Sequence, residues 1–450
     1  MVVDPKPSTR AQGAGLWLRL ALYAVMLPPL LVVPFGLGRS QTAVALAIVG
    51  FVVCIGVAAW PRTRRAIARA FAHSGVLRGV DALLWNLALL LAIGELALGV
   101  AARFVSSPLL VTPNARSQAR IAEARAQVID YFGPGAGNSR GHTDREPLAD
   151  ASGVVRIVAL GDSFAYGVVG YEANFLTLLE AQLTARTGVP VEVVNLGLPN
   201  LQPKDYLHML VDDGLPLHPD LVLVCLFTGN DFKAPGNTML FDGRNWRVVA
   251  FATRLFGVVR ERARAPAPAL PVAAPKGWIP TPQGFSEQTY LDIAKGYVPV
   301  VRRAPDHDTR DALAATLSIL AETVAVAAPT PVALAVLPDE LQVNPALRAR
   351  VLAALAVPES DLDLDRPAQA TRAALEDRVV AVIDLLPPLA AAEREAPTYE
   401  PRDSHWNVRG NAAAARALAE ALEAPVRRIA TAKALRPGHA ATAAPAEAIP

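Results

Sequence analysis

The chain has little of what disulfide-linked and cofactor-binding proteins need. Only two of its 450 residues are cysteines, Cys54 and Cys225, and each lies within an apolar run. This excludes a disulfide framework and a cysteine-based metal site. The sequence has no CxxC, HExxH, P-loop or GxGxxG motif, so we expect neither a metal nor any other cofactor. The formal net charge of +2 is too small to argue for nucleic-acid binding.

What the chain has in excess is apolar residues. Hydrophobic residues make up 52% of the sequence and the mean hydropathy is +0.29, which is high for a fully soluble protein. Three long apolar stretches open the chain, at about residues 16–37, 42–60 and 80–102. Each is near the ~20 residues that a membrane-spanning helix needs. Residues 1–104 are therefore predicted to form an anchor of about three transmembrane helices.

The first stretch has an alternative interpretation as a signal peptide. Pro28, Pro29 and Pro34 weaken it as a helix. No clear small-x-small cleavage site follows, however, and a second apolar stretch comes at once, which favours an uncleaved helix. Within the third stretch, Glu95 is a costly intramembrane carboxylate. One glutamate does not indicate a transporter, so we expect it to be protonated, or paired with another span or with Arg103.

The arginines predict the orientation in the membrane. The connection between the first two stretches has only Arg39, whereas the connection between the second and third has five arginines. These are Arg62, Arg64, Arg65, Arg69 and Arg78. Lys6, Arg10 and Arg19 flank the start of the first stretch. The positive-inside rule then places the amino terminus in the cytoplasm and everything after Arg103 outside it. We predict a multi-pass inner (plasma) membrane protein, with the lipid bilayer as a partner and a periplasmic or extracytoplasmic carboxyl-terminal part.

Strand-like and helix-like segments alternate from residue 155 onward. The strand candidates are residues 155–160, 191–195, 221–227, 332–337 and 379–385. The helix candidates between them are residues 174–187, 203–213, 308–327, 345–355 and 368–377, and an Ala-rich helix covers 410–422. This alternation predicts an α/β fold with a parallel sheet covered on both faces.

Three segments do not follow this alternation. Residues 105–153 lack sustained periodicity and are predicted to be a linker that packs loosely. Residues 232–303 interrupt the third crossover with Pro-rich and Ala-rich sequence, which indicates an insertion, as a lid or a flexible excursion over the active edge. Residues 425–450 are rich in Ala and Pro and are predicted to be disordered. The α/β domain is thus expected at residues 154–424.

The first strand candidate ends abruptly at Gly161-Asp162-Ser163, and helical patterning follows from Phe164. Ser163 would therefore lie at the carboxyl end of a parallel strand, where open α/β sheets bind their ligands. The adjoining helix terminus also favours developing negative charge. A serine in this position can be a nucleophile or a helix N-cap, and the tripeptide alone favours the cap.

Polar residues of complementary chemistry follow three other strands. Gly197 follows the second strand, and its N–H could face an oxyanion. Asn230 follows the third strand and could supply a second donor, while Asp403 and His405 follow the fifth. Taken singly, each has a structural explanation, and Asn407 is predicted to be the N-cap of the last helix. Together with Ser163 they make up what acyl transfer requires, and their consistent order favours one shared site.

The blocks GDSF, NLG, GND and DSHWN, in this order, resemble those of the SGNH (GDSL) hydrolase family, over roughly residues 155–424. The resemblance implies a flavodoxin-like three-layer α/β/α sandwich with strand order 2-1-3-4-5. It implies Ser163 as nucleophile and oxyanion-hole donor, Gly197 and Asn230 as the remaining oxyanion-hole donors, His405 as general base, Asp403 as its orienting carboxylate, and Asp162 in a structural role.

Two departures from the family pattern bear on the reaction. Thr228 stands where the third block usually has glycine, and Asp403 and His405 are two residues apart where three is usual. The closer spacing is similar to that of the membrane-linked branch that includes alginate O-acetyltransferase-like proteins. Residues i and i+2 of an extended segment point the same way, so this spacing allows the pair to form.

Three functions fit this sequence. The first is a membrane-anchored serine esterase that removes acyl groups, most plausibly acetyl, from an acylated envelope glycan or lipid. The second is an O-acyltransferase that modifies an exported polysaccharide with the same triad and depends on envelope polysaccharide-assembly partners for its donor. The third is a catalytically silent glycan-binding SGNH module, against which the complete set of site residues argues.

Overall fold

The computed structural model describes residues 73–111, 114–132, 138–233, 246–263 and 284–435, together with Trp60 and Arg69. The chain divides into two compact units. One comprises residues 1–115 and 238–263, and the other comprises residues 116–237 and 264–450. The second unit holds the parallel sheet that the alternation of strands and helices predicts, which confirms the α/β class.

The sheet has five parallel strands in the order β2-β1-β3-β4-β5, which is the order that the family resemblance implies. They are β1 (Val155–Leu160), β2 (Val191–Asn195), β3 (Leu221–Phe227), β4 (Val332–Leu337) and β5 (Ala381–Asp384). The bounds predicted for the first four strands are confirmed, and the fifth strand is shorter at both ends than predicted. Every residue of the first four strands is buried, as expected of apolar runs in a sheet covered on both faces.

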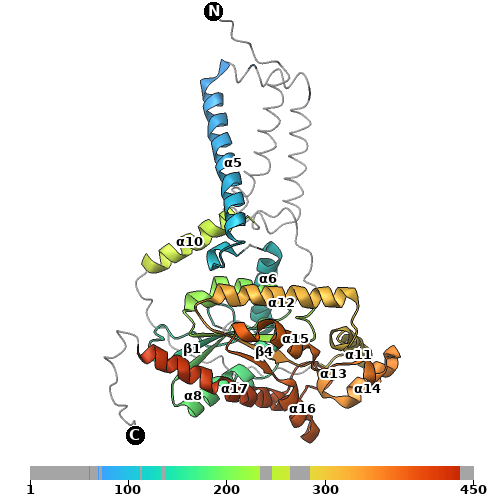
Figure 1. Cartoon of the computed structure of the whole chain (residues 1–450). Coiled ribbons are helices and arrows are strands. Elements are labelled where there is room, and N and C mark those ends of the chain that lie inside the picture. Colours follow the sequence, from blue (N-terminus) through green and yellow to red (C-terminus); the bar gives the residue numbers. More distant parts are fainter. Residues whose placement is uncertain are drawn as a thin grey trace, which may run out of the picture. The chain divides into compact units, whose positions relative to one another are not determined.

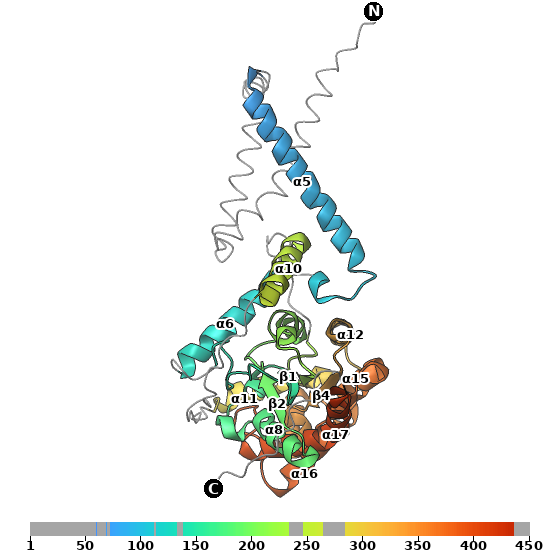
Figure 2. The same ribbon diagram turned by 90° about the vertical axis from the view of Figure 1, so that its left-hand side faces the viewer.

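Helices cover both faces of this sheet (Figure 1). On one face α8 (Phe175–Thr187), α16 (Leu386–Glu395) and α17 (Val408–Ala434) share one apolar cluster with β1, β3 and β4. Figure 2 shows these three helices gathered on the side of the sheet away from α12. On the other face lie α6 (Ala115–Phe132), α9 (Pro203–Met209), α12 (His307–Ala327) and α15 (Arg366–Leu375). The result is a three-layer α/β/α arrangement.

The segment predicted to be one insertion belongs to both units. Residues 238–263, which include α10 (Arg247–Ala263), fall with the amino-terminal unit. Residues 284–303 pack onto the α/β unit through α11 (Glu287–Lys295) and a 3₁₀ turn at Val298–Val301. There Tyr290 and Val301 share a third apolar cluster with α13 (Glu340–Val343) and α14 (Pro345–Leu355). Residues 264–283 lie outside the described residues.

The segment predicted to be a loosely packed linker contains helix α6 and a buried polar stretch. His142 and Asp144 are buried, and an Asp144 Oδ2 atom accepts the Asn195 N–H at 2.7 Å, at the end of β2. Loose packing was therefore the wrong expectation for this stretch. The error arose because its contacts are made by single polar side chains, which leave no apolar periodicity in the sequence.

The last helix also extends beyond its prediction. Helix α17 runs through Pro425 to Ala434, into the segment predicted to be disordered. Pro425 and Val426 are buried, and Arg427 Nη1 donates to the Thr187 carbonyl at 2.9 Å. A disordered tail beginning at residue 425 is therefore wrong, because tertiary contacts hold this part of the helix despite its composition. Residues 436–450 lie outside the described residues.

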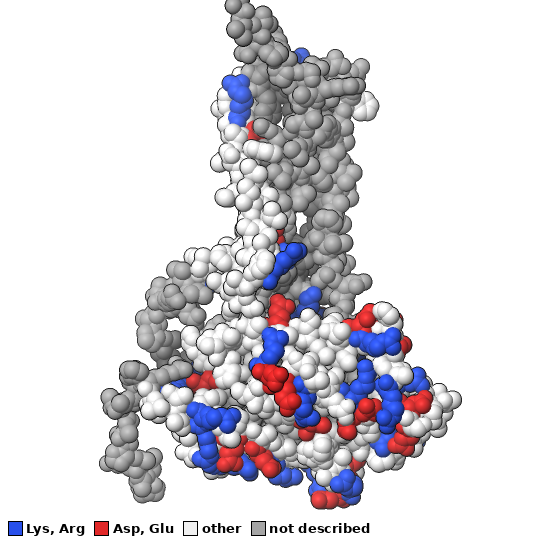
Figure 3. Space-filling model, viewed as in Figure 1, with Lys and Arg blue, Asp and Glu red and all other residues white. Residues whose placement is uncertain are grey.

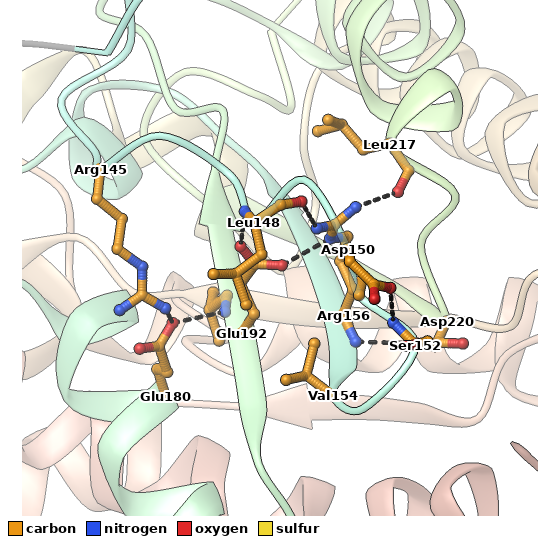
Figure 4. A network of polar contacts seen from close by, with 12 residues as sticks. Arg145, Leu148, Asp150, Ser152, Val154, Arg156, Glu180, Glu192, Leu217 and Asp220 are labelled. Atoms are coloured by element: carbon orange, nitrogen blue, oxygen red, sulfur yellow. Dashed lines mark hydrogen bonds and ion pairs between the residues drawn. The ribbon is translucent and has the colours of Figure 1, made fainter. Parts of the chain in front are cut away.

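The amino end of β1 is held by a buried charge network (Figure 4). Arg156 Nε donates to Glu192 Oε2 at 2.6 Å, Nη1 donates to the Leu217 carbonyl at 2.7 Å, and Nη2 donates to the Leu148 carbonyl. The Leu148 N–H in turn donates to Glu192 Oε1 at 2.6 Å. Removing one partner of such a buried pair costs ~3–5 kcal/mol, so this network fixes Leu148 to the sheet at the end opposite the predicted site.

The amino-terminal unit contains α5 (Gly75–Ala101), which within the described residues is the one helix long and apolar enough to cross a membrane by length and composition. It begins earlier than the predicted third span, and Ser74 caps it. Leu83 and Leu96 are about two-thirds exposed along it. On the face shown in Figure 3, charged side chains are few along α5 and many on the α/β unit. Residues 16–37 and 42–59, predicted to form the first two spans, lie outside the described residues.

Glu95 of α5 caps helix α10. Its two carboxylate oxygens accept the backbone N–H groups of Arg247 and Val248, each at 3.1 Å. The Arg247 guanidinium lies 3.6 Å from the same carboxylate. We expected Glu95 to pair with another span or with Arg103, and that expectation was wrong. The Glu95 carboxylate instead accepts from the first N–H groups of α10, which have no acceptor within their own helix.

Candidate active site

Ser163 opens a short helix, α7 (Ser163–Tyr166), directly after β1. The N-cap of this helix is Asp162, whose Oδ1 accepts the Phe164 N–H at 2.9 Å. Ser163 is therefore not the cap, and its own N–H lies in the first turn, where backbone donors have no acceptor within the helix. Gly161 makes the sharp turn possible, since a Cβ there would lie 2.7 Å from the Ala165 Cβ.

The structure brings Ser163, His405 and Asp403 into one hydrogen-bonded chain. His405 Nε2 lies 2.8 Å from Ser163 Oγ, and His405 Nδ1 lies 2.5 Å from Asp403 Oδ1. With the ring proton on Nδ1, the imidazole donates to the carboxylate and accepts from the serine hydroxyl. The His405 and Asp403 side chains are 21% and 15% exposed, so a substrate can reach the serine while water only partly surrounds the pair.

The two-residue spacing of Asp403 and His405 works through a turn, not through the extended segment we expected. The Asp403 N–H donates to the Glu400 carbonyl at 3.1 Å, and the Glu400 N–H donates to the His405 carbonyl at 2.9 Å. Arg402 has φ +55°, in the left-handed region. The turn also lets the His405 N–H approach Asp403 Oδ1 at 3.3 Å. The carboxylate thus contacts both the ring and the backbone of the histidine.

Aromatic rings hold the imidazole in place. The Phe164 ring lies 5.1 Å from the His405 ring and 4.2 Å from the Phe227 ring, measured between centroids. The buried Trp406 packs edge-on against Phe164 at 5.0 Å and against Phe175 at 5.6 Å. Such contacts between rings restrict the histidine to few orientations. As predicted, Asn407 is the N-cap of α17, where it accepts the N–H groups of Arg409 and Gly410.

Asn230 lies beside the serine turn and is oriented by Asp162. Asn230 Nδ2 donates to Asp162 Oδ2 at 2.8 Å. Burial raises the pKa of Asp162, while the hydrogen bonds from Phe164 N–H and from Asn230 act in the opposite direction. A side-chain amide has two N–H donors, so one remains for a ligand at Ser163.

Gly197 does not present the free donor that we expected. Its N–H donates to Asn195 Oδ1 at 2.8 Å, which is a departure from the predicted oxyanion donor. Its place in the site is explained by packing instead. A Cβ on Gly197 would lie 2.5 Å from the Tyr166 nitrogen and 2.6 Å from the Ala165 Cβ, so only glycine lets this loop pass against α7.

Sequence reasoning missed the two residues that support this loop, Asn195 and Asp144. Besides holding Gly197, Asn195 donates from Nδ2 to the Ala165 carbonyl at 2.7 Å, just after the serine turn. Asp144 binds the Asn195 N–H, and burial raises the pKa of its carboxyl to about 7. Asn195 belongs to the NLG block and could have been singled out there. Asp144 lies in the segment without periodicity and carries no signal of its own.

No cluster of metal-binding side chains accompanies this site in the part of the chain that the structure describes. Cys225 lies in β3 behind the serine turn, is buried, and has a thiol pKa that burial raises above its ordinary value. A thiol of that kind is not a nucleophile. The chemistry available at this site is that of a serine, an imidazole, a carboxylate and nearby N–H donors.

Comparison with known proteins connects part of this chain to one family. Residues 306–446 match the family described as SGNH hydrolase-like domain, acetyltransferase AlgX, a range that includes Asp403 and His405 but not Ser163. No curated protein matches the chain.

Two solved structures are similar to the chain at low identity. The lipase Lip_vut3 from a goat rumen metagenome is 13% identical with a TM-score of 0.31, and the match covers 61% of this chain and 99% of the lipase. The α/β hydrolase LAE5 from the metagenome of Lake Arreo, Spain, is 15% identical with a TM-score of 0.29, and the match covers 59% of this chain and 94% of that enzyme.

Proposed function

Since its residues 306–446 give this chain an SGNH hydrolase-like domain of the AlgX kind, we propose that it is a membrane-anchored serine esterase that removes acetyl groups from an envelope glycan or lipid. The observation that carries the proposal is the hydrogen-bonded chain from Ser163 through His405 to Asp403. A serine whose hydroxyl meets an imidazole that a carboxylate orients is the arrangement that acyl transfer uses on unrelated folds.

The reaction follows from these contacts. Ser163 Oγ attacks the ester carbonyl while His405 Nε2 takes its proton, and Asp403 stabilises the imidazolium. The carbonyl oxygen becomes an oxyanion, which the Ser163 N–H and the second amide hydrogen of Asn230 can bind. The C–O bond then breaks, the alcohol leaves with the proton from His405, and the acyl group remains on Ser163. Water repeats these steps in reverse, which releases the acid and restores the serine.

The second candidate is an O-acyltransferase, favoured by the AlgX-type match and by the two-residue spacing of Asp403 and His405. Its first half-reaction is the same. In the second half a sugar hydroxyl replaces water as the acceptor, so the acyl group moves to the sugar and the hydroxyl proton passes through His405. A catalytically silent glycan-binding module is disfavoured, because binding alone does not require a serine hydrogen-bonded to an imidazole that a carboxylate orients.

The first experiment measures p-nitrophenyl acetate turnover by the detergent-solubilised full chain. Burst kinetics and intact mass would report acetyl bound to the protein, and peptide mapping would locate it. We expect one acetyl group on the peptide that contains Ser163, and no turnover in Ser163→Ala. Ser360→Ala is the matched control, because Ser360 is exposed and, within the described part of the chain, its hydroxyl has no hydrogen bond; its backbone carbonyl accepts from Arg303 Nε. Equal activity in wild type and Ser163→Ala would refute the serine mechanism.

A double-mutant comparison tests the pairing of serine and histidine. Residues of a triad act as a unit, so Ser163→Ala, His405→Ala and the double variant should have similarly low residual kcat. Asp403→Asn should lower kcat less than loss of the serine does. Losses that multiply in the double variant would mean that His405 is not the base of Ser163. Adding an oligosaccharide acceptor then separates the two candidates: acetyl transfer to sugar at the expense of free acetate identifies the transferase.

A further inference from the structure

Two buried asparagines that the reaction above does not use connect the serine turn to the histidine turn through the interior of the protein. They are Asn174, which is the N-cap of α8, and Asn411, which lies in the first turn of α17. A buried amide is held in one orientation by its hydrogen bonds, and it holds its partners in turn. The contacts of each asparagine lead toward one half of the proposed active site.

Asn174 holds the end of the short helix that Ser163 opens. Its Nδ2 donates to the Ala165 carbonyl at 3.1 Å and to the Tyr166 carbonyl at 3.3 Å, while its Oδ1 caps α8. A Cβ on Gly167 would clash with this amide, so glycine is what lets it reach the two carbonyls. A single helical turn has few hydrogen bonds of its own, so the position of Ser163 depends on such outside contacts.

Asn411 holds the residues that follow His405. Its Nδ2 donates to the Trp406 carbonyl at 3.1 Å and to the Asn407 carbonyl at 3.0 Å. Its Oδ1 accepts the Phe175 N–H, in the first turn of α8, at 3.0 Å. This network determines which way the amide points, because the two carbonyls can only accept and the N–H can only donate. Asn411 therefore ties the histidine turn to the start of α8.

The contacts of the two amides meet at one point of the chain. Asn174 and Phe175 are consecutive, so both sets of hydrogen bonds end at the start of α8. On one side they lead to the helix that begins with Ser163, and on the other to Trp406, which directly follows His405. The Trp406 ring packs edge-on against Phe175 in the same region. The serine and the histidine are thus joined by a short path of hydrogen bonds and covalent bonds.

Helices α8 and α17, which lie side by side, are also tied at the other end of α8 (Figure 1). There Arg427 Nη1 donates to the Thr187 carbonyl at 2.9 Å, and Arg186 Nε donates to Glu423 Oε2 at 2.9 Å. The 13 residues of α8 extend over ~20 Å, so these contacts are remote from the asparagines. The two ends of α8 therefore allow a contact that holds the helices together to be separated from one that also reaches the triad.

We propose that Asn174 and Asn411 together, the asparagine link, set the alignment of Ser163 Oγ with His405 Nε2, which lie 2.8 Å apart. They are positioning residues, which act through the turns that they hold and exchange no proton with the ester. Displacing a reacting group by 1 Å can cost ~10²-fold in rate, so the link should affect kcat far more than substrate binding. This inference rests on the proposed function and adds to it the residues that keep the two halves of the site in register.

The test measures kcat per active site with p-nitrophenyl acetate, on the full chain in detergent. Titrating Ser163 to completion with a fluorophosphonate counts the folded sites, so that unfolded protein does not enter kcat. Asn411→Ala removes both sets of contacts, whereas Asn411→Asp keeps an acceptor for the Phe175 N–H and loses the donors to the Trp406 carbonyl. We expect each variant to lower kcat per site about tenfold, with KM changing by less than about twofold.

Arg427→Met is the matched control, because it removes a contact between the same two helices at the remote end. It should lower the free energy of unfolding and leave kcat per site unchanged. Asn174→Asp keeps the cap of α8 but loses the donors to α7. It should lower kcat by a smaller factor, since Asn195 also holds the Ala165 carbonyl. Residues that act through one link are not additive, so Asn174→Asp combined with Asn411→Ala should lose no more than Asn411→Ala alone.

Unchanged kcat per site in the Asn411 variants would overturn the asparagine link. So would losses that multiply in the double variant, or an equal loss of kcat in Arg427→Met. If Asn411→Ala does not fold, Asn411→Asp and its combination with Asn174→Asp serve for the same comparison. Turnover that does not depend on Ser163 would refute the proposed function and the link with it, whereas unchanged kcat in an enzyme that does depend on Ser163 overturns the link alone.

Discussion

Asp162 performs two tasks with one carboxyl group. Its Oδ1 caps the helix that Ser163 opens, and its Oδ2 holds the amide of Asn230. The proposed nucleophile and a proposed oxyanion donor are therefore aligned by a single buried residue, which is 0% exposed and has its pKa raised by that burial. Preorganised donors of this kind matter most when the substrate oxygen becomes negative.

The hydrogen bond between Asp162 and Asn230 predicts how substitution of each residue changes kcat. Asn230→Ala removes the amide and should lower kcat by ~10²–10³-fold with little change in KM, as loss of one oxyanion donor does. Asp162→Asn keeps a capping oxygen but cannot accept as well from Asn230, so it should lower kcat by a smaller factor. Steady-state kinetics with p-nitrophenyl acetate measures both.

Asn344→Ala serves as the control for these variants, because Asn344 caps α14 away from the triad and its loss should lower stability without lowering kcat. If Asn230→Ala raised KM while kcat stayed constant, Asn230 would bind the ground state and would not act as an oxyanion donor.

At the residue scale, the sequence predicted which chemical groups meet but not all of the contacts that they make. Ser163 was found because it directly follows a strand whose end is predictable, whereas Asp403 and His405 lie beyond α16 and were found through the DSHWN block and the order of the polar residues. The N–H of Gly197 was assigned to an oxyanion, yet it binds Asn195 Oδ1, a detail of side-chain rotation that no spacing encodes. Asp144 was missed because its signal is a hydrogen bond to the Asn195 N–H, which exists only in three dimensions.

At the scale of elements, the strands were the most predictable part of the fold. Four of the five have the bounds that their apolar runs predict, since a strand buried on both faces is mostly apolar. The helices were less predictable where tertiary contacts decide. Helix α6 was absent from the prediction, and α17 runs past Pro425 because Val426 is buried.

The contact between α5 and α10 predicts how hydrogen exchange at the start of α10 depends on Glu95. Glu95 binds the first two N–H groups of α10. Hydrogen bonds to a charged group contribute ~1.5–3 kcal/mol, so Glu95→Ala should release the start of α10 and raise hydrogen–deuterium exchange of residues 247–250 by ~10-fold or more. Glu95→Gln keeps one acceptor and should have a smaller effect.

Thr253→Ala is a suitable control, since among the described residues the Thr253 hydroxyl bonds within α10 alone, to the Val249 carbonyl at 2.9 Å. Exchange in α12, which lies in the other unit, should be the same in all three variants. Unchanged exchange at residues 247–250 in Glu95→Ala would mean that the carboxylate does not anchor α10.

At the scale of the whole molecule, the chain passes between its two units three times, at residues 115–116, 237–238 and 263–264. A fragment that begins at residue 153 would lack α6 and the buried Asp144, both of which pack onto the α/β unit. Functional measurements therefore belong on the full chain. The segment predicted to be one insertion in fact supplies α10 to one unit and Tyr297 to the other.

The arginines before and at the start of α5 predict the orientation of the whole molecule in the membrane. Five arginines precede or begin α5, and the cost of translocating them favours a cytoplasmic location for that end of the helix. The α/β unit, which follows α5, would then face the extracytoplasmic side. Cysteine labelling tests this in a Cys54→Ser background, where Cys225 is buried and should stay unlabelled.

Ser360→Cys places a thiol on an exposed residue of the α/β unit, and Ala66→Cys places one among the arginines. A membrane-impermeant maleimide added to cells with a permeabilised outer envelope and an intact inner membrane should label the first variant and not the second, which should react only after lysis. The reverse result would place the triad in the cytoplasm. Because an exported glycan would then be out of reach of Ser163, that result would also remove the envelope substrate from the proposed function while leaving the serine chemistry intact.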